Sequence, residues 1–247
     1  MARPSKTRII AMWSGPRNLS TAMMYSFGAR ADCAVWDEPF YAPYLKATGI
    51  DHPLAAETMA VCENEPDAVG RLCREAPSGG EPLYYQKHHT HHMLASFDLG
   101  WMEAAQHVFL IRHPARVIAS YAKKRENPTL QDVGGAEQLA IFERASAAMG
   151  REPLVVDSAD IRDAPEPMLR AICDWLEIDF DAAMLRWPAG GRPEDGPWAS
   201  HWYGAVHRST GFAEPEGPLP DLPAELRPLL DAALPPYEAL KARALKL

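Results

Sequence analysis

Cysteines are few in this sequence, and none of them forms a C-x-x-C pair. The four stand in or near apolar patterns, at Cys33, Cys62, Cys73 and Cys173. Small buried thiols have this placement, so we expect free cysteines rather than disulfides. Long apolar runs are also lacking: only five apolar residues, 9–13, precede Gly15, too few for a signal peptide or a membrane span. We therefore expect a soluble cytoplasmic protein with no membrane partner.

Basic residues are outnumbered, with 25 Lys and Arg against 33 Asp and Glu and a net charge of -8. A phosphate backbone selects for basic surfaces, so the balance excludes nonspecific binding to nucleic acid. Any polyanionic ligand must then be held by a local cluster of basic side chains. The 247 residues, 47% of them hydrophobic, suit one domain over 1–247.

Prolines gather at the C-terminus, at Pro215, Pro218, Pro220, Pro223, Pro228, Pro235 and Pro236. Because proline breaks a helix interior, we expect no long helix there. The prediction is a Pro-rich wrap over the body from about residue 213, ending in short helices.

Apolar runs of strand length alternate with helical patterns along the chain, and no internal repeat is visible. The predicted strands are 8–13, 33–37, 83–87, 107–112 and 153–157, and the predicted helices are 19–30, 66–76, 114–126, 135–150 and 165–177. This alternation predicts an α/β fold, a three-layer parallel sheet with helices on both faces. Such sheets bind ligands at the carboxyl ends of their strands.

A polar turn after the first predicted strand is the most informative segment. It reads Gly15, Pro16, Arg17, Asn18, Leu19, Ser20 and Thr21, the last two opening a helix. Backbone N–H groups of the turn and of the first helical turn converge there, and Arg17 adds charge, so the segment predicts a cradle for phosphate or sulfate. It differs from a nucleoside-triphosphate P-loop because the second glycine and the lysine of that motif are missing.

A second anion-binding pattern follows the fourth predicted strand. Arg112 ends that strand, Pro114 suits the first position of a helix, and Ser120 comes two turns later. Arg112 and Ser120 can meet one phosphate from two sides through charge-assisted hydrogen bonds.

Taken together, the two segments resemble the sulfotransferases that use 3′-phosphoadenosine 5′-phosphosulfate (PAPS). In that family a strand-loop-helix binds the 5′-phosphosulfate and a later R-x-P-x-x-V-x-x-S segment binds the 3′-phosphate, which here are similar to 15–21 and 112–120. The resemblance covers roughly residues 8–160 and implies the P-loop NTPase-like sulfotransferase fold. It also implies PAPS as co-substrate, no metal, and a small organic acceptor with a hydroxyl or amine.

Two departures from the family pattern stand out. Leu19 stands where many members have a glycine. The C-terminal glycine and lysine segment that covers the nucleotide in the cytosolic branch is absent, and Arg208, followed by Gly211, is the nearest substitute.

Two residues compete for the role of general base toward the acceptor. Glu38 lies in an E-P pair after the second predicted strand, and the resemblance implies a base there in one branch of the family. The other branch uses the histidine of a K-[ST]-H motif, similar to Lys87-His88-His89. We favour Glu38, since Trp36, Phe40 and Tyr41 beside it would raise its pKa by desolvation.

Four histidines fall within residues 88–92. They cannot all face one ion, and no carboxylate accompanies them at a suitable spacing, so we expect no metal site. One or two should line the cleft and the rest should be solvated. An acceptor pocket or ordinary packing would equally explain the aromatic residues Phe40, Tyr41, Tyr44, Trp198, Trp202 and Tyr203.

Two other functions stay open at this point. A P-loop kinase acting on a small molecule would need a metal-binding acid, for which Asp157 is available, and a Walker lysine, for which nothing is. A noncatalytic nucleotide-binding protein on the same fold is the other alternative. The sequence does not identify the acceptor, nor does it decide between a monomer and a homodimer.

Overall fold

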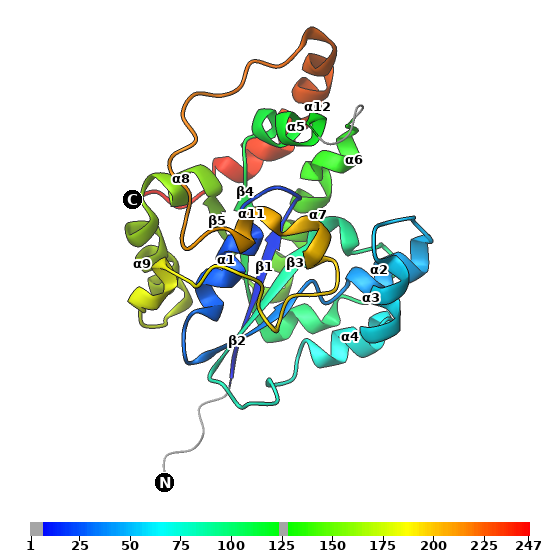
Figure 1. The fold of residues 1–247 in the computed structure, drawn as a ribbon, viewed down its shortest axis with the longest axis vertical. Coiled ribbons are helices and arrows are strands. Elements are labelled where there is room, and N and C mark those ends of the chain that lie inside the picture. The colour runs from blue at the N-terminus through cyan, green and yellow to red at the C-terminus, as the bar shows by residue number, and fades with distance from the viewer. Residues whose placement is uncertain (1–6, 124–127) are drawn as a thin grey trace.

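A five-stranded parallel sheet forms the centre of the protein in the computed structural model, which describes residues 7–123 and 128–247. Its strand order is β2-β3-β1-β4-β5 (Figure 1). The strands are β1 (Arg8–Ser14), β2 (Cys33–Asp37), β3 (Leu83–His89), β4 (Ala105–Ile111) and β5 (Leu154–Asp157). Because all five are parallel, their carboxyl ends share one edge of the sheet.

Side chains of β1 alternate between two buried clusters. Ile10 and Met12 belong to a cluster with residues of α1 (Ser20–Gly28) and α9 (Pro165–Leu176). Ile9 and Trp13 belong to another, with residues of α7 (Gly135–Met149) and α12 (Arg227–Lys241). A strand buried on both faces has this pattern, which explains why the strands read as continuous apolar runs. The predicted three-layer arrangement is confirmed.

The remaining helices surround the sheet (Figure 1). They are α2 (Tyr41–Thr48), α3 (Ala55–Val61), α4 (Pro66–Leu72), α5 (Pro114–Ala122), α6 (Leu130–Val133), α8 (Ser158–Asp163), α10 (Ala199–Trp202) and α11 (Gly204–His207). Single 3-10 turns are η1 (Thr90–His92), η2 (Gly100–Ala104), η3 (Ala182–Leu185) and η4 (Ala224–Leu226). Among the described residues no helix is both long and apolar enough to cross a membrane.

The five predicted strands and five predicted helices are all present, with ends shifted by up to a few residues. Residues 124–126 of the predicted helix 114–126 lie outside the described residues. The four cysteines are free, as expected.

The prediction that prolines prevent a long C-terminal helix is wrong. Helix α12 has 15 residues and continues through Pro235 and Pro236. Tertiary packing outweighs helix propensity here: a Cβ on Gly135 of α7 would lie only 3.2 Å from Cγ of Pro236, so the two helices approach closely at that proline. After α12 the chain returns to the sheet, where the Leu245 amide donates to the Val155 carbonyl at 2.8 Å.

Candidate active site

The turn between β1 and α1 has an unusual backbone. Arg17 and Leu19 have φ values of 61° and 68°, in the left-handed region that favours glycine. Asn18, between them, is buried and donates from Nδ2 to the Leu110 carbonyl at 3.2 Å, which fastens the turn to β4. Leu19 thus takes a conformation that favours glycine, at the position where the resemblance implies a glycine in many family members. Strain of this kind, held by surrounding structure, is common in binding loops.

The N-terminus of α1 points its free N–H groups into this turn. Leu19 precedes the helix and offers no side-chain cap, and the first turn carries no acidic residue. The amides of Ser20 and Thr21 therefore have no partner within the helix, and the helix dipole favours an anion beside them. The anion cradle at 15–21 stays a prediction, and the uncapped N-terminus of α1 is compatible with it.

The Arg17 guanidinium lies between two aromatic rings. Its Cζ is 5.7 Å from the centroid of Tyr121 on α5 and 5.9 Å from that of Trp202 on α10. Cation–π contacts of this kind hold the side chain in place while leaving its N–H groups available to an anion.

Arg112 follows β4 directly and links the two predicted anion sites. Its Nη1 donates to the carbonyl of Arg17 at 2.7 Å, and its other nitrogens donate to Glu216. Ser120 lies half-buried on α5, whereas Arg208 is exposed at the C-cap of α11. The structure therefore brings Arg112 to the turn at 15–21, and it leaves Arg208 on the surface.

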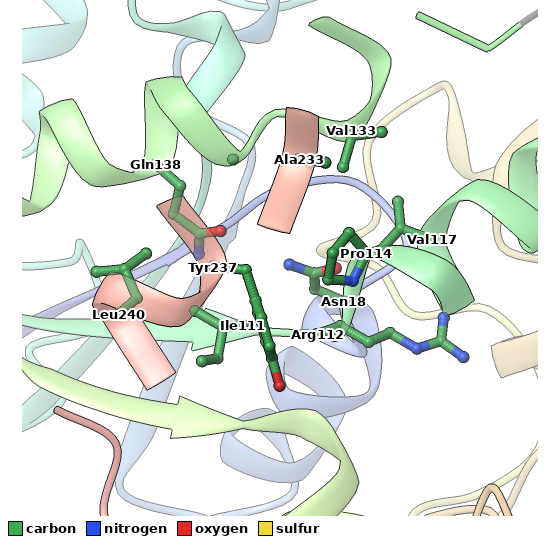
Figure 2. Close-up of a pocket in the computed structure, with 11 residues that line it drawn as sticks. Asn18, Ile111, Arg112, Pro114, Val117, Val133, Gln138, Ala233, Tyr237 and Leu240 are labelled. Carbon is green, nitrogen blue, oxygen red and sulfur yellow. The ribbon is translucent and has the colours of Figure 1, made fainter. Parts of the chain in front are cut away.

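A small cavity lies behind the turn, between Asn18 and Tyr237 of α12 (Figure 2). Its volume of about 20 Å³ suits a single water molecule and excludes a nucleotide. Arg112 also lines this cavity, but in Figure 2 its guanidinium points away from Tyr237 and Leu240.

Lys87, at the carboxyl end of β3, is completely buried between two carboxylates. Its Nζ lies 2.9 Å from Asp37 Oδ1, and it also donates to Glu38 and, at 2.6 Å, to the Tyr203 hydroxyl. Tyr203, just after α10, lies 2.8 Å from Asp37 Oδ2, and Trp198 donates to its hydroxyl at 3.0 Å. A buried ammonium needs such partners, and breaking the cluster would leave a charge unpaired.

Glu38 also faces two histidines. Its Oε1 is 3.2 Å from Nε2 of His89, and its Oε2 is 3.9 Å from Nδ1 of His92. The other nitrogen of His89, Nδ1, lies 3.5 Å from the Ser14 hydroxyl at the end of β1. Glu38 itself has φ 46°, so its backbone too is held in a strained conformation.

The pKa of Glu38 is shifted in the direction opposite to the one expected. Burial opposes its ionisation, but the charge of Lys87 and the contacts with His89 and His92 outweigh burial and hold this pKa well below its ordinary value. In the neighbouring carboxyl of Asp37 burial dominates and raises the pKa. The expectation that aromatic neighbours raise the Glu38 pKa is wrong, because the cation beside it comes from β3.

The histidines of residues 88–92 are not solvated, which corrects another expectation. His88 is buried between Trp13 and Trp101, with ring centroids 4.6 and 4.9 Å away. His92 is buried and stacks on Tyr41 at 4.8 Å. Alternation along the strand explains why the two neighbours differ. Consecutive side chains of β3 point to opposite faces of the sheet, so His88 enters the core whereas His89 contacts Glu38.

Comparisons with known proteins decide the family. Residues 7–244 match the sulfotransferase domain family. The chain belongs to this family. It is also 39% identical over 242 residues to branched-chain-amino-acid aminotransferase-like protein 1 of Arabidopsis thaliana, and 37% identical over 233 residues to protein 2 of the same name. These alignments cover 98% and 94% of the chain but only 42% and 41% of the relatives, so the chain spans about two fifths of their length.

Solved sulfotransferase structures share the fold. The domain from the Synechococcus PCC 7002 olefin synthase is 19% identical with a TM-score of 0.51, covering 94% of this chain and 96% of that one. The domain from the curacin biosynthetic pathway is 16% identical with a TM-score of 0.55, covering 92% and 97%. The Alicyclobacillus acidocaldarius sulfotransferase is 14% identical with a TM-score of 0.53, covering 99% and 98%. The P-loop-like sulfotransferase fold expected from the sequence is confirmed.

Sequence reasoning did not single out several residues of the site. Asp37 precedes Glu38 at the end of β2, and this pair of acidic residues could have indicated that Asp37 also belongs to the site. Glu216 reaches the site from an irregular segment, and no local motif marks it. Tyr203 was named only as a candidate for an acceptor pocket or for ordinary packing, not as a partner of Lys87 and Asp37. Arg116 and Arg162 complete the contacts to Glu216, and no sequence signal pointed to this role for either of them.

Proposed function

We propose that this chain transfers a sulfuryl group from PAPS to a hydroxyl or amine of a small organic acceptor. The observation that carries the proposal is the 2.7 Å hydrogen bond from Arg112 to the Arg17 carbonyl. This bond joins the two segments to which we assign anion binding, at one edge of the sheet. The acid-base cluster of Glu38, Lys87 and His89 lies at the same edge, since it follows β2 and β3.

The donor would be held at both of its phosphorylated ends. In this proposal the turn 15–21 and the N-terminus of α1 bind the 5′-phosphosulfate, with Arg17 over its oxygens. Arg112 and Ser120 bind the 3′-phosphate. These residues fit an anion because Leu19 leaves the first amides of α1 uncapped and the side chain of Arg17 is already positioned by two rings.

In the transfer, the acceptor oxygen or nitrogen forms a bond to sulfur while the bond from sulfur to the 5′-phosphate oxygen breaks. The leaving group is 3′-phosphoadenosine 5′-phosphate, and the acceptor gives up one proton. Positive charge on the oxygens that gain charge is the main requirement, and Arg17 and the α1 N-terminus supply it in this proposal.

We assign removal of the proton that the acceptor gives up to the pair of Glu38 and His89. The low pKa of Glu38 keeps it ionised, which makes it a weak base alone but a good partner for the Nε2–H of His89 at 3.2 Å. That tautomer leaves Nδ1 of His89 as an acceptor. Lys87, held by both carboxylates, keeps Glu38 in place.

The kinase alternative has less support. Asp157, its metal-binding acid, caps α8 by accepting from the Ala159 amide at 3.0 Å. The same carboxylate accepts from Tyr237 at 2.9 Å and pairs with Lys241 at 2.9 Å. Its oxygens are therefore committed to structural partners.

Calorimetric titration with 3′-phosphoadenosine 5′-phosphate, and separately with ATP and magnesium, tests the proposal. We expect the bisphosphate to bind, with excess EDTA present throughout, and to bind more tightly than ATP. Selective binding of ATP that depends on magnesium would favour the kinase. Where the bisphosphate binds, transfer from PAPS to a panel of small alcohols and amines tests catalysis and separates an enzyme from a noncatalytic binder.

A further inference from the structure

Three arginines from different parts of the fold surround one carboxylate, that of Glu216. Arg112 follows β4, Arg116 lies on α5 and Arg162 lies on α8. Nη1 of Arg162 lies 2.7 Å from Oε1 of Glu216, Nε of Arg116 lies 3.2 Å from Oε2, and Arg112 donates to both oxygens. The Glu216 side chain is only 6% exposed.

Glu216 is carried by residues 213–222, which we call the strap; Figure 1 shows it in orange, running past α8 toward α12. Most residues of the strap before Leu222 are exposed, so apolar packing contributes little to holding it. Two of the three arginines also donate hydrogen bonds to the backbone of the strap: Arg162 to the Glu214 carbonyl at 2.9 Å and Arg116 to the Glu216 carbonyl at 3.2 Å. Gly217, at φ 67° with open space around it, turns the chain directly after the carboxylate.

The charges of this cluster do not balance. Among the described residues, the three guanidinium groups share one carboxylate, which leaves an excess of two positive charges. Guanidinium forks match the tetrahedral oxygens of a phosphate as well as they match a carboxylate. A phosphate dianion would neutralise the arginines more fully than Glu216 does, and it offers one more acceptor oxygen.

We propose that Arg116 and Arg162 join Arg112 in binding the 3′-phosphate of the donor, and that this phosphate displaces Glu216 and releases the strap. The inference rests on the proposed function through Arg112, which we assign to the 3′-phosphate. Glu216 then acts as an internal competitor. The apparent affinity for a bisphosphate nucleotide is reduced by the fraction of molecules in which Glu216 occupies the site.

Glu216→Gln tests the competition, because it removes the charge and keeps the shape. We expect this variant to bind 3′-phosphoadenosine 5′-phosphate about tenfold more tightly than the unaltered chain, with little change for adenosine 5′-phosphate, which lacks the 3′-phosphate. Glu214→Gln is the matched control: it changes an exposed carboxylate on the same strap and should alter neither affinity. Equal or weaker binding of the bisphosphate by Glu216→Gln would overturn the proposal.

Arg162→Gln tests the added binding residue. We expect it to weaken the bisphosphate about tenfold or more and to spare adenosine 5′-phosphate. Hydrogen exchange of residues 213–222 gives a second readout. Exchange should speed up when the bisphosphate is added, and it should already be fast in Glu216→Gln. A strap that stays equally protected in the bound state would contradict displacement.

Inorganic phosphate separates this inference from the choice of donor. Without the Glu216 charge the arginines repel one another, so Glu216→Gln should melt at a lower temperature at low ionic strength. Millimolar phosphate should restore its Tm, while chloride at equal ionic strength restores less. If no variant binds the bisphosphate, the proposed donor is wrong, and the phosphate result still decides whether the arginines form a phosphate site: restoration supports it and no restoration overturns it.

Discussion

The Nε2 atom of His89 lies 3.2 Å from Oε1 of Glu38, so the two bases that the sequence offered as alternatives are partners. A carboxylate that accepts a hydrogen bond from one imidazole nitrogen fixes the tautomer and leaves the other nitrogen free to accept a proton. The two nitrogens of His89 face Glu38 and Ser14, respectively.

Glu38→Gln and His89→Ala should both lower single-turnover transfer, by about 10² to 10⁴ for His89→Ala. Glu38→Gln should cost less, because it removes the partner and leaves the imidazole. Donor affinity should change little in either variant, since the pair lies beside β2 and β3 rather than in the turn at 15–21. Rates across pH provide the measurement. A normal rate in His89→Ala with loss in Glu38→Gln would assign the base to Glu38 alone.

The position of Glu38 follows from the sequence, whereas its ionisation does not. A short apolar run ending in Asp37 predicts a strand, and parallel strands bring their carboxyl ends to one edge. The lowered pKa of Glu38 depends on Lys87, 49 positions later in the chain, which becomes its neighbour only through the pairing of β2 with β3. Reasoning from the aromatic residues near Glu38 in the sequence therefore gave the wrong direction for its pKa shift.

The contacts of Glu216 were even harder to predict from the sequence. It lies in a Pro-rich segment without periodicity, and its partner Arg112 is 104 positions away. Conversely, the turn at 15–21 was readable because strand, turn and helix are contiguous in the chain. Motifs that are local in sequence were predicted, and contacts made by irregular segments were not.

Replacing Lys87 by methionine should destabilise the protein by about 3–5 kcal/mol, because the neighbouring carboxylates stay buried without their cation. Asp37 and Glu38 are both in direct contact with the ammonium, and its side chain is 0% exposed. Denaturant unfolding at pH 7 gives the value. Lys46→Met, which removes an exposed ion pair with Glu65, should cost less than about 1 kcal/mol and serves as the control. An equal loss of unfolding free energy in the two variants would contradict a large contribution of the buried cluster to stability.

Leu19→Gly should be more stable than Leu19→Ala by about 1 kcal/mol, the reverse of the order in a helix interior. Both variants lose the same contacts of a partly buried side chain with the core, but only glycine relieves the left-handed backbone at φ 68°. The difference in unfolding free energy between the two variants is the measurement. Alanine at least as stable as glycine would show that the turn relaxes to another conformation.

Arg112→Ala should weaken binding of 3′-phosphoadenosine 5′-phosphate more than tenfold, since a lost charged hydrogen bond costs about 1.5–3 kcal/mol. Adenosine 5′-phosphate should lose much less. Because Arg112 also supports the turn through the Arg17 carbonyl, Ser120→Ala is the cleaner companion: it should weaken the bisphosphate and leave the monophosphate unchanged. Calorimetry of both nucleotides decides, and equal losses for the two ligands would contradict the 3′-phosphate assignment.

As the pH falls, this protein should begin to lose stability at a pH well above the pKa values of ordinary carboxyl groups. Burial lowers the pKa of five histidines, to about 3 for His91, to about 4 for His107, well below the ordinary value for His88 and His92, and below it for His113. The unfolded chain then binds more protons than the folded one below pH 6.5. Stability is fully present above that pH and is lost as pH falls toward the lowered values.

Each such histidine contributes about 1.4 kcal/mol of lost stability per pH unit once the unfolded chain is protonated. Asp37 acts in the opposite direction because burial raises its pKa. We therefore expect the free energy of unfolding to fall steeply as the pH drops from 6.5 to 5, measured by urea unfolding between pH 7.5 and 5. His91→Phe should keep the ring contact with Tyr44 and reduce the slope by one proton. A slope near zero in this interval would show that the buried histidines gain protons without unfolding.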